Sequence, residues 1–267
     1  MAIIRVDHVD KSFPTRHGSI AIMQEITFDV KDSDFLAIVG PSGCGKSTLL
    51  RLIQGLDHPT AGTIWFRDKK VDTVASGMAM VFQNFALFPW LTVSQNVGFG
   101  LEALGWDPER IASQVERYVE VTGLDGFEEA YPREISGGMR QRVGLARALA
   151  VEPTVLLMDE PFSALDALTA EGLREEVLQL WRDPNLPPEA VVLVTHNIEE
   201  AIQLADRVVV LSRRPGHVLA EVGVDLPRPR DRKSTAFYEL TDRVYSLITE
   251  GGAPGAATAN GGPASAH

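Results

Sequence analysis

The chain has 267 residues, 45% of them hydrophobic and 23% charged, with a formal net charge of −11 and a pI of about 5.0. These values are typical of a soluble globular protein with one large domain, and the acidic balance disfavours binding to a nucleic-acid backbone. The single cysteine, Cys44, excludes an internal disulfide and fits a reducing compartment. No apolar stretch approaches the roughly 20 residues that span a bilayer, and the first residues lack a secretory-signal pattern, so we expect any membrane contact to go through a partner.

The first half of the chain begins with short β-type runs and one helix. Strands are predicted at residues 3–7, 26–30, 35–39, 62–66 and 78–82, and a helix at residues 46–54, directly after a glycine-rich turn. From about residue 93 to 123 the apolar residues follow helical spacing, which predicts a helical insertion. Gly137 and Gly138 then open another helix, predicted at residues 139–150.

The second half alternates strands with helices. Strands are predicted at residues 154–158, 190–195 and 207–211, and helices at residues 167–181 and 198–205. Continuous apolar strands that alternate with helices indicate a parallel sheet covered on both faces. Residues 218–225 are predicted to add an edge strand and residues 235–248 a final helix. The tail, residues 251–267, consists of small and nearly uncharged residues and is predicted to be disordered.

A phosphate-binding loop is predicted at residues 40–47, Gly-Pro-Ser-Gly-Cys-Gly-Lys-Ser, which match the P-loop pattern between a strand and a helix. The glycines let backbone N–H groups turn toward phosphate oxygens, and the helix N-terminus adds positive potential. Lys46 can reach the β- and γ-phosphates, and Ser47 can bind Mg²⁺. The alternative is a chance glycine loop, which composition alone produces about once in a hundred such chains. The predicted nucleotide contacts are Gly40, Pro41, Ser42, Gly43, Cys44, Gly45, Lys46, Ser47 and Thr48.

Two carboxylates follow the apolar strand at residues 154–158. Asp159 is predicted to hold Mg²⁺, and Glu160 to act as the general base for the water that attacks the γ-phosphate. An acidic residue at a strand end is often only a helix cap. The P-loop earlier in the chain favours the catalytic interpretation, and the second carboxylate favours hydrolysis over binding alone.

The sequence resembles the ATP-binding subunits of ABC transporters over about residues 1–250. Besides the P-loop and the acidic pair, residues 135–141, Ile-Ser-Gly-Gly-Met-Arg-Gln, resemble the ABC signature, although the family more often has glutamine where Met139 stands. The resemblance implies an α/β fold, the P-loop NTPase fold of ABC ATPase type, with an antiparallel β subdomain and a helical subdomain at about residues 90–150. It also implies that Ser136, Gly137 and Gly138 face the ATP held by the opposite subunit of a head-to-tail homodimer, in the same kind of anion site as the P-loop. The alternative is a serine-glycine loop that merely caps a helix.

Four further residues match family positions. Gln83 resembles the Q-loop glutamine, which senses Mg²⁺ and the permease, and Asp166 lies in a segment similar to the D-loop, which bridges the subunits. His196 resembles the switch histidine at the γ-phosphate; the alternative is a solvated histidine after a strand. Phe13 stands where the family stacks an aromatic ring, more often tyrosine, on adenine; the alternative is a buried strand-end aromatic. The resemblance thus implies ATP and Mg²⁺ as cofactors and Glu160, His196 and Gln83 as catalytic residues.

Three segments resemble the nitrate, sulfonate and taurine importer branch of the family. They are residues 88–93 (Phe-Pro-Trp-Leu-Thr-Val), 214–217 and 226–230. The branch implies uptake of a small anion through separate transmembrane permease subunits, fed by an extracytoplasmic binding protein, with this chain peripheral on the cytoplasmic face of the cell membrane. Gln83 and residues 88–91 are expected to receive a permease helix. The alternative places Trp90 in the core.

Other classes of protein remain as alternatives. A non-transport ABC ATPase usually carries coiled-coil arms, zinc-binding cysteines or two cassettes, and the sequence shows none of these. A simple P-loop switch or kinase would not need residues 136–138 or Asp166. A transporter for another ligand would share every residue named above, because the transported ligand is recognised by the binding protein and the permease.

Overall fold

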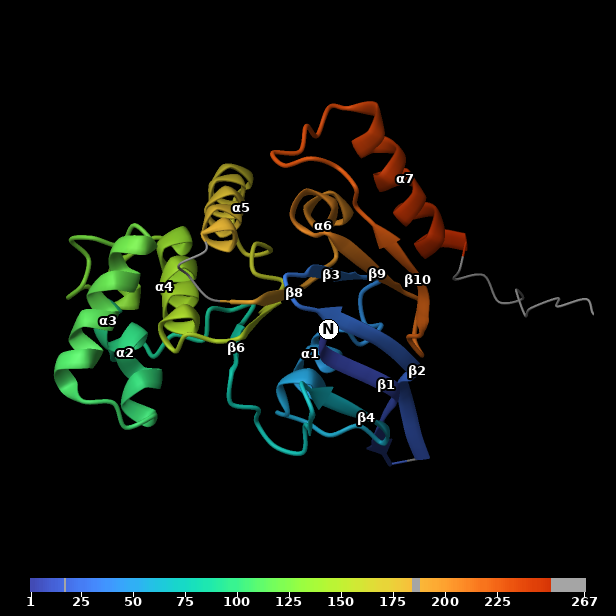
Figure 1. Cartoon of the computed structure of the whole chain (residues 1–267), viewed down its shortest axis with the longest axis horizontal. Helices are drawn as coiled ribbons and strands as arrows, with labels where there is room; N and C mark the ends of the chain where they lie inside the picture. Colours follow the sequence, from blue (N-terminus) through green and yellow to red (C-terminus); the bar gives the residue numbers. More distant parts are fainter. Residues whose placement is uncertain (17, 184–187, 251–267) are drawn as a thin grey trace, which may run out of the picture.

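The computed structural model describes residues 1–16, 18–183 and 188–250, so the predicted disordered tail at residues 251–267 lies outside the described residues. Two β-sheets organise the chain (Figure 1). The smaller sheet is antiparallel, in the order β2 (Gly18–Lys31), β1 (Ala2–Thr15), β4 (Ala61–Phe66) and β5 (Lys69–Lys70). The larger has the order β10 (Val218–Gly223), β9 (Arg207–Leu211), β3 (Phe35–Val39), β8 (Ala190–Thr195), β7 (Val155–Asp159) and β6 (Met78–Val81).

The larger sheet is parallel except for its edge strand β10, and both of its faces are covered. Because side chains alternate along a strand, each central strand contributes to two cores. In β3, Phe35 and Val39 belong to one hydrophobic cluster, whereas Leu36 and Ile38 belong to the other. The continuous apolar strands of the second half therefore form the predicted parallel sheet.

Helices lie on both faces of this sheet (Figure 1). Helix α1 (Lys46–Gln54) packs between the two sheets, with Leu49 and Ile53 fully buried in the same cluster as Ile4 and Val6 of β1. The opposite face is covered by α5 (Ala167–Arg182), α6 (Ile198–Leu204) and α7 (Thr235–Glu250). Among the described residues, no helix is both long and apolar enough to cross a membrane.

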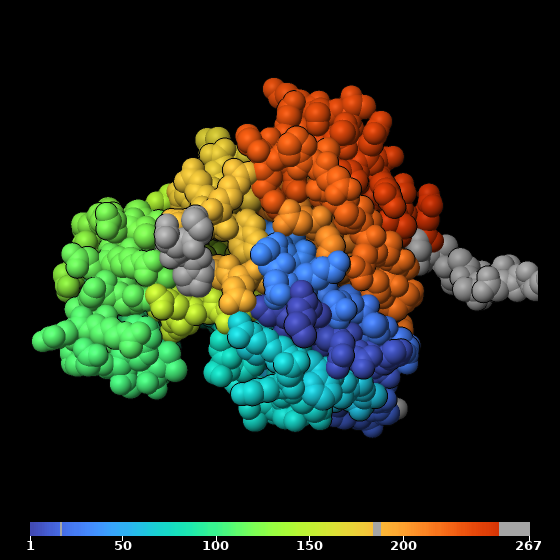
Figure 2. All heavy atoms as spheres, in the orientation of Figure 1, coloured from blue at the N-terminus to red at the C-terminus, as the bar shows by residue number. Residues whose placement is uncertain are grey.

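Three helices form a block beside the larger sheet, which protrudes in green in the space-filling view (Figure 2). They are α2 (Val93–Ala103), α3 (Pro108–Val121) and α4 (Gly137–Ala150), with a 3₁₀ turn, η1 (Pro132–Glu134), before α4. The predicted helical insertion at 93–123 consists of the two helices α2 and α3. Asp107 separates them because its side chain accepts a hydrogen bond from the Arg110 N–H and caps α3, and Pro108 follows at the first helical position.

The first two strands are much longer than their predicted bounds of 3–7 and 26–30. The predicted bounds cover only parts that face the core, whereas the end of β1 and the start of β2, which include Phe13 and Ile20, are exposed. Their length comes from pairing with each other, from Ala2 opposite Lys31 to Thr15 opposite Gly18. The other predicted strands and helices agree with the structure within two residues at each end, within the usual uncertainty of such boundaries.

Candidate functional site

The predicted site residues gather where four neighbouring parallel strands end. Strands β3, β8, β7 and β6 lie side by side, so their carboxyl ends meet at one edge of the sheet. The P-loop follows β3, His196 follows β8, Asp159 and Glu160 stand at the end of β7, and Gln83 lies two residues after β6. In an open α/β sheet, this edge is where ligands bind.

The loop at residues 40–45 is held by its backbone conformation and by strand β2. Gly43 and Gly45 have φ values of +76° and +107°, which a residue with a side chain would rarely adopt. A Cβ on Gly45 would also lie 2.8 Å from the side chains of Ile22 and Met23 in β2. The Lys46 ammonium is buried and donates to the carbonyl oxygens of Gly40 at 2.9 Å and Pro41 at 3.2 Å, so a cation lies within the loop.

Cys44, in the middle of this loop, is fully buried. Burial raises the pKa of its thiol, so the sulfur stays protonated at neutral pH and is a weak nucleophile. We infer from this environment that the Cys44 side chain fills space beneath the loop.

Ser47 and Asp159 come together although 112 positions separate them. The Ser47 hydroxyl donates to the Asp159 carboxylate at 2.7 Å. Burial raises the pKa of Asp159, and the neighbouring charge of Glu160 adds to the rise, whereas the hydrogen bond from Ser47 and the cationic Arg51 and Lys46 oppose it. A buried carboxylate beside a hydroxyl, with its ionised form disfavoured, is an environment that a bound cation would stabilise.

Glu160 is the centre of a second cluster. Its carboxylate accepts from the Gln83 amide at 3.3 Å and lies 3.1 Å from Nδ1 of His196. Glu160 has a φ of +46°, an uncommon backbone conformation for a residue with a side chain, and its N–H donates to the carbonyl of Val194 in β8. The Glu160 side chain is 18% exposed and that of His196 57% exposed, so the carboxylate is fixed in position but remains accessible.

The signature residues lie apart from this edge. Ser136 caps α4, where its hydroxyl accepts from the Met139 N–H at 3.2 Å, and Gly137 and Gly138 form the first turn. In the part of the chain that the structure describes, no hydrogen bond or ion pair joins residues 136–138 to the P-loop. Asp166 caps α5 and accepts from both the N–H and the hydroxyl of Thr169, and these bonds lower the pKa of Asp166.

Phe13 is 40% exposed, so the alternative of a buried strand-end aromatic is wrong. It lies opposite Ile20 of β2, two residues before Ile22, whose side chain would meet a Cβ on Gly45. The Lys11 ammonium lies 4.8 Å from the centre of its ring, and Asp57 and the carbonyl of His58 hold that ammonium. One ring face is thus covered by a cation.

Residues 23–163, more than half of the chain, match the model of the family described as ABC transporter. The chain belongs to the ABC transporter family. Membership makes it an ATP-binding ATPase, as the sequence predicted, and confirms the family resemblance from which Gln83, Asp166 and His196 were named.

Relatives of this ABC protein extend over nearly its whole length. The nitrate import ATP-binding protein NrtD of Synechocystis sp. is 42% identical over 254 residues, which cover 92% of this chain and 94% of NrtD. The aliphatic sulfonates import ATP-binding protein SsuB of Bacillus cereus is 40% identical over 249 residues, covering 93% and 97%. The dimeric, post-hydrolysis structure of the ATP-binding cassette MJ0796 bound to ADP and Pi is 29% identical with a TM-score of 0.73, covering 83% and 98%. This likeness confirms the predicted P-loop fold of ABC ATPase type.

Some residues at the ABC site were not singled out from the sequence. The Ser163 hydroxyl donates to the backbone carbonyl of Glu160 at 2.8 Å and receives the Gln83 amide at 3.4 Å, so it supports both. Ser163 is the first residue of the segment similar to the D-loop, and a serine shortly after a strand end is a common local backbone partner, but the sequence analysis assigned it no role of its own. Three arginines at residues 228–232 also contact the helix that follows His196, and nothing in their spacing indicated this.

Proposed function

We propose that this chain is the ATP-hydrolysing subunit of an ABC importer, which couples ATP binding and hydrolysis in a head-to-tail homodimer to uptake of a small anion through a separate permease. The observation that carries the proposal is the collection of P-loop, acidic pair, His196 and Gln83 at one edge of the sheet. This set of residues suits hydrolysis of a nucleoside triphosphate rather than binding alone.

The P-loop binds the phosphates in this proposal. Its backbone N–H groups and the N-terminus of α1 face the phosphate oxygens, and Lys46 neutralises the β- and γ-phosphates. Residues 40–45 enclose the phosphates together with Ser47 and Thr48, while Phe13 stacks its uncovered ring face on adenine.

The oxygen donors at the end of β7 fit Mg²⁺, which prefers hard oxygen ligands and keeps several waters. Ser47, Asp159 and Gln83 would hold the ion, and the close Ser47–Asp159 pair is the observation that supports this set. When bound, Mg²⁺ neutralises charge on the β- and γ-phosphates.

Glu160 is the proposed general base. Its carboxylate accepts a proton from the attacking water, and Gln83 and His196 keep that carboxylate turned toward the strand ends. His196 also contacts the γ-phosphate through its exposed ring. The left-handed backbone at Glu160 directs the side chain across the sheet edge, toward the ends of β6 and β8.

The separation of residues 136–138 from the P-loop of the same chain supports the dimer. Ser136 is exposed at the N-terminus of α4, where free N–H groups can meet an anion. A second copy placed head to tail would bring these N–H groups to the γ-phosphate of the first, and Asp166 would lie between the copies. Closure of the dimer would then depend on the charge of the γ-phosphate, and release of the cleaved phosphate would separate the two copies.

An exposed aromatic group beside Gln83 suits the permease contact. Trp90 is 70% exposed, so the alternative of a core tryptophan is wrong. Phe88 stacks with Trp90 at 5.6 Å and with Phe99 at 4.4 Å between ring centres. Arg147 of α4 bonds to the carbonyls of residues 85 and 86 and lies 5.8 Å from the Phe88 ring, so this surface is tied both to α4 and to the loop that carries Gln83.

The small-anion assignment rests on the similarity to proteins named for sulfonate and nitrate import and on the three branch-like segments. An extracytoplasmic binding protein would deliver the anion, and this chain would sit on the cytoplasmic face of the cell membrane. In cells lacking the chain, we expect loss of uptake of at least one of the three anions, sulfonate, taurine or nitrate. Normal uptake of all three would refute the anion assignment.

The dimer is tested with the full chain carrying Glu160→Gln. We expect ATP turnover to fall by about 10²- to 10⁴-fold, because the general base is lost, while ATP and Mg²⁺ convert the protein to a dimer in light scattering. ADP should leave it monomeric. The matched control adds Ser136→Arg, which places a bulky cation at the N-terminus of α4 and should restore the monomer. If Glu160→Gln stays monomeric with ATP, or if the variant that also carries Ser136→Arg still forms a dimer, the head-to-tail arrangement is contradicted.

The permease is tested by purifying the tagged chain from gently solubilised membranes. A multi-span protein in near-equal amount, lost when Trp90 is replaced by serine, would support the importer. Recovery only from the soluble fraction would favour a non-transport ABC ATPase.

A further inference from the structure

Three arginines occupy alternate positions in the segment Leu-Pro-Arg-Pro-Arg-Asp-Arg at residues 226–232, here called the arginine strap. The strap crosses from the edge strand β10 to α7, and its arginines contact α6, the short helix that begins directly after His196 and Asn197. Their contacts cover both ends of this helix.

Arg230 closes the C-terminal end of α6. Its side chain is 1% exposed, and the guanidinium donates to backbone carbonyls that a helix end would otherwise leave without partners. The acceptors are the carbonyl oxygens of Ile202 at 2.7 Å, Gln203 at 3.2 Å and Ala205 at 2.5 Å, with Val224 at 3.1 Å and Leu226 at 3.2 Å. Burial lowers the pKa of Arg230 to about 10, so the group stays charged at neutral pH.

Arg228 connects the same helix end to the strand that leads into the P-loop. It donates to the carbonyl of Leu204 at 2.5 Å and pairs with Asp206 at 2.6 Å. Asp206 in turn exchanges two hydrogen bonds with the backbone of Phe35, the first residue of β3. The end of α6 is therefore fixed relative to the start of β3.

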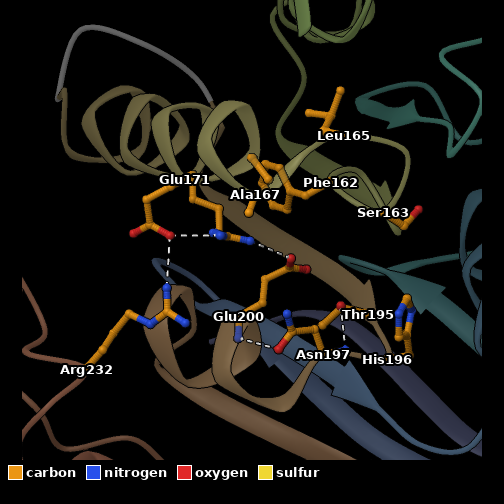
Figure 3. Close-up of a pocket in the computed structure, with 12 residues that line it drawn as sticks. Phe162, Ser163, Leu165, Ala167, Glu171, Thr195, His196, Asn197, Glu200 and Arg232 are labelled. Atoms are coloured by element: carbon orange, nitrogen blue, oxygen red, sulfur yellow. Dashed lines mark hydrogen bonds and ion pairs between the residues drawn. The ribbon is translucent and has the colours of Figure 1, made fainter. Parts of the chain in front are cut away.

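Arg232 contacts the first turn of α6 and also α5. It pairs with Glu199 of α6 and, at 3.0 Å, with Glu171 of α5. Arg174 of α5 pairs with the same Glu171 at 2.8 Å and with the buried Glu200 of α6 at 3.2 Å. Figure 3 shows the pairs through Glu171 and Glu200 as a chain of charges that joins α5, α6 and the strap beside a pocket of about 420 Å³, which His196 and Ser163 also line.

The two helices held in this way begin at the site. Helix α6 has seven residues, about 10 Å of length, so a shift at either end moves His196. Helix α5 begins at its cap, Asp166. The His196 side chain is 57% exposed, and in the described part of the chain Glu160 is its one hydrogen-bonding partner, so its position depends on the backbone between the end of β8 and the start of α6.

We propose that the arginine strap positions the catalytic edge. Arg230 and Arg228 fix the end of α6, and Arg232 ties the first turn of α6 to α5. His196 therefore stays against Glu160, and Asp166 keeps its position relative to His196. Arg232 and Arg230 are positioning residues, since neither touches the reacting atoms. The inference rests on the proposed role of His196 in ATP hydrolysis.

Arg232 is the position to test, because the Arg232 and Glu199 side chains are 41% and 48% exposed. Exposed pairs contribute little to stability, so Arg232→Gln should fold as the parent does. In the full chain we expect kcat for ATP hydrolysis to fall about three- to tenfold, with KM for ATP changed less than about twofold, because positioning and not binding is lost. The thermal midpoint should stay unchanged.

Two variants sharpen the test. Glu199→Gln removes one of the two partners of Arg232 and should reproduce part of the fall in kcat. The double variant should lose no more than Arg232→Gln alone, because Arg232→Gln already breaks the pair with Glu199. The matched control is Arg243→Gln on α7, an exposed arginine that forms no ion pair within residues 1–16, 18–183 and 188–250 and should keep parental kcat and KM.

The outcomes separate the strap from the function on which it rests. His196→Ala should abolish most turnover; if it does not, the role of His196 is wrong and the proposed function fails at that residue. If His196→Ala is inactive but Arg232→Gln keeps the parental kcat, only the strap proposal is overturned. A parallel rise in KM, or a lowered thermal midpoint that accounts for the loss, would overturn it as well.

Discussion

Gly138 in the first turn of α4 offers a test of how closely the helical block packs against α5. A Cβ at this position would lie 2.5 Å from Cγ2 of Thr169, far inside van der Waals contact. Thr169 cannot turn away freely, because its hydroxyl donates to Asp166 at 2.6 Å and a β-branched side chain has few rotamers. Gly138→Ala should therefore force α4 and α5 apart.

The cost of the added methyl group follows from two opposing terms. Overpacking a tight contact costs about 1–3 kcal/mol, while alanine is favoured over glycine within a helix by up to about 1 kcal/mol. We expect Gly138→Ala to lower the free energy of unfolding by about 1–2 kcal/mol, which corresponds to roughly 2–8 °C in thermal midpoint for a chain of this size.

The same change is compared in a Thr169→Ser background, which removes Cγ2 and keeps the hydroxyl that donates a hydrogen bond to Asp166. In that background Gly138→Ala should be neutral or slightly stabilising, because the contact is gone and the gain in helix propensity remains. Urea unfolding of the four proteins measures the coupling. An equal loss of stability in both backgrounds would refute the packing argument. The assay measures unfolding and not turnover, because Gly138 is also a proposed ATP contact.

Two further predictions concern buried polar groups. Burial raises the pKa of Asp159, so its stabilising contribution belongs to the protonated form, is present at low pH and is lost as pH rises through the folded-state pKa. Asp159→Asn should thus raise the thermal midpoint at pH 7 while abolishing turnover. The gain in thermal midpoint should shrink as pH falls toward the folded-state pKa of Asp159. A variant that is less stable than the parent at pH 7 would contradict this. Tyr118 is fully buried, burial raises its pKa to about 12, and its hydroxyl has no hydrogen-bonding partner among the described residues. Tyr118→Phe should therefore leave turnover unchanged and raise the free energy of unfolding by about 1 kcal/mol, and a loss of that size in urea unfolding would show that the hydroxyl is satisfied.

The P-loop and the acidic pair could be proposed from the sequence because each lies next to a strong local signal. The P-loop stands between an apolar strand and an apolar-periodic helix, and Asp159 and Glu160 directly follow a strand. The assignment of Gln83, Asp166 and His196 came from the family resemblance, since periodicity says nothing about a single polar residue after a strand. The roles of all these residues remain predictions that the variants above test.

Long-range pairing was beyond the reach of the sequence. The order of β3, β8, β7 and β6 brings Ser47 to Asp159, yet no local pattern states which strands are neighbours. The same limit hid the arginine strap: the Arg230 side chain is buried against carbonyls of α6, whereas the alternating prolines and arginines of residues 227–230 suggest an exposed loop. Buried charges depend on partners that only the fold supplies.

The helical block has a topological property that bears on motion and on evolution. Residues 82–154 leave the larger sheet at the end of β6 and return at the start of its neighbour β7, so the whole block is one excursion between adjacent strands. Only two chain crossings hold it covalently, so a movement of the block need not break any strand pair. Because closure entropy rises by only about 0.6 kcal/mol when a loop doubles in length, an insertion between α2 and α3 would leave the P-loop, Asp159, Glu160 and His196 at their strand ends. The surface proposed to meet the permease can thus vary while these strand ends keep their residues.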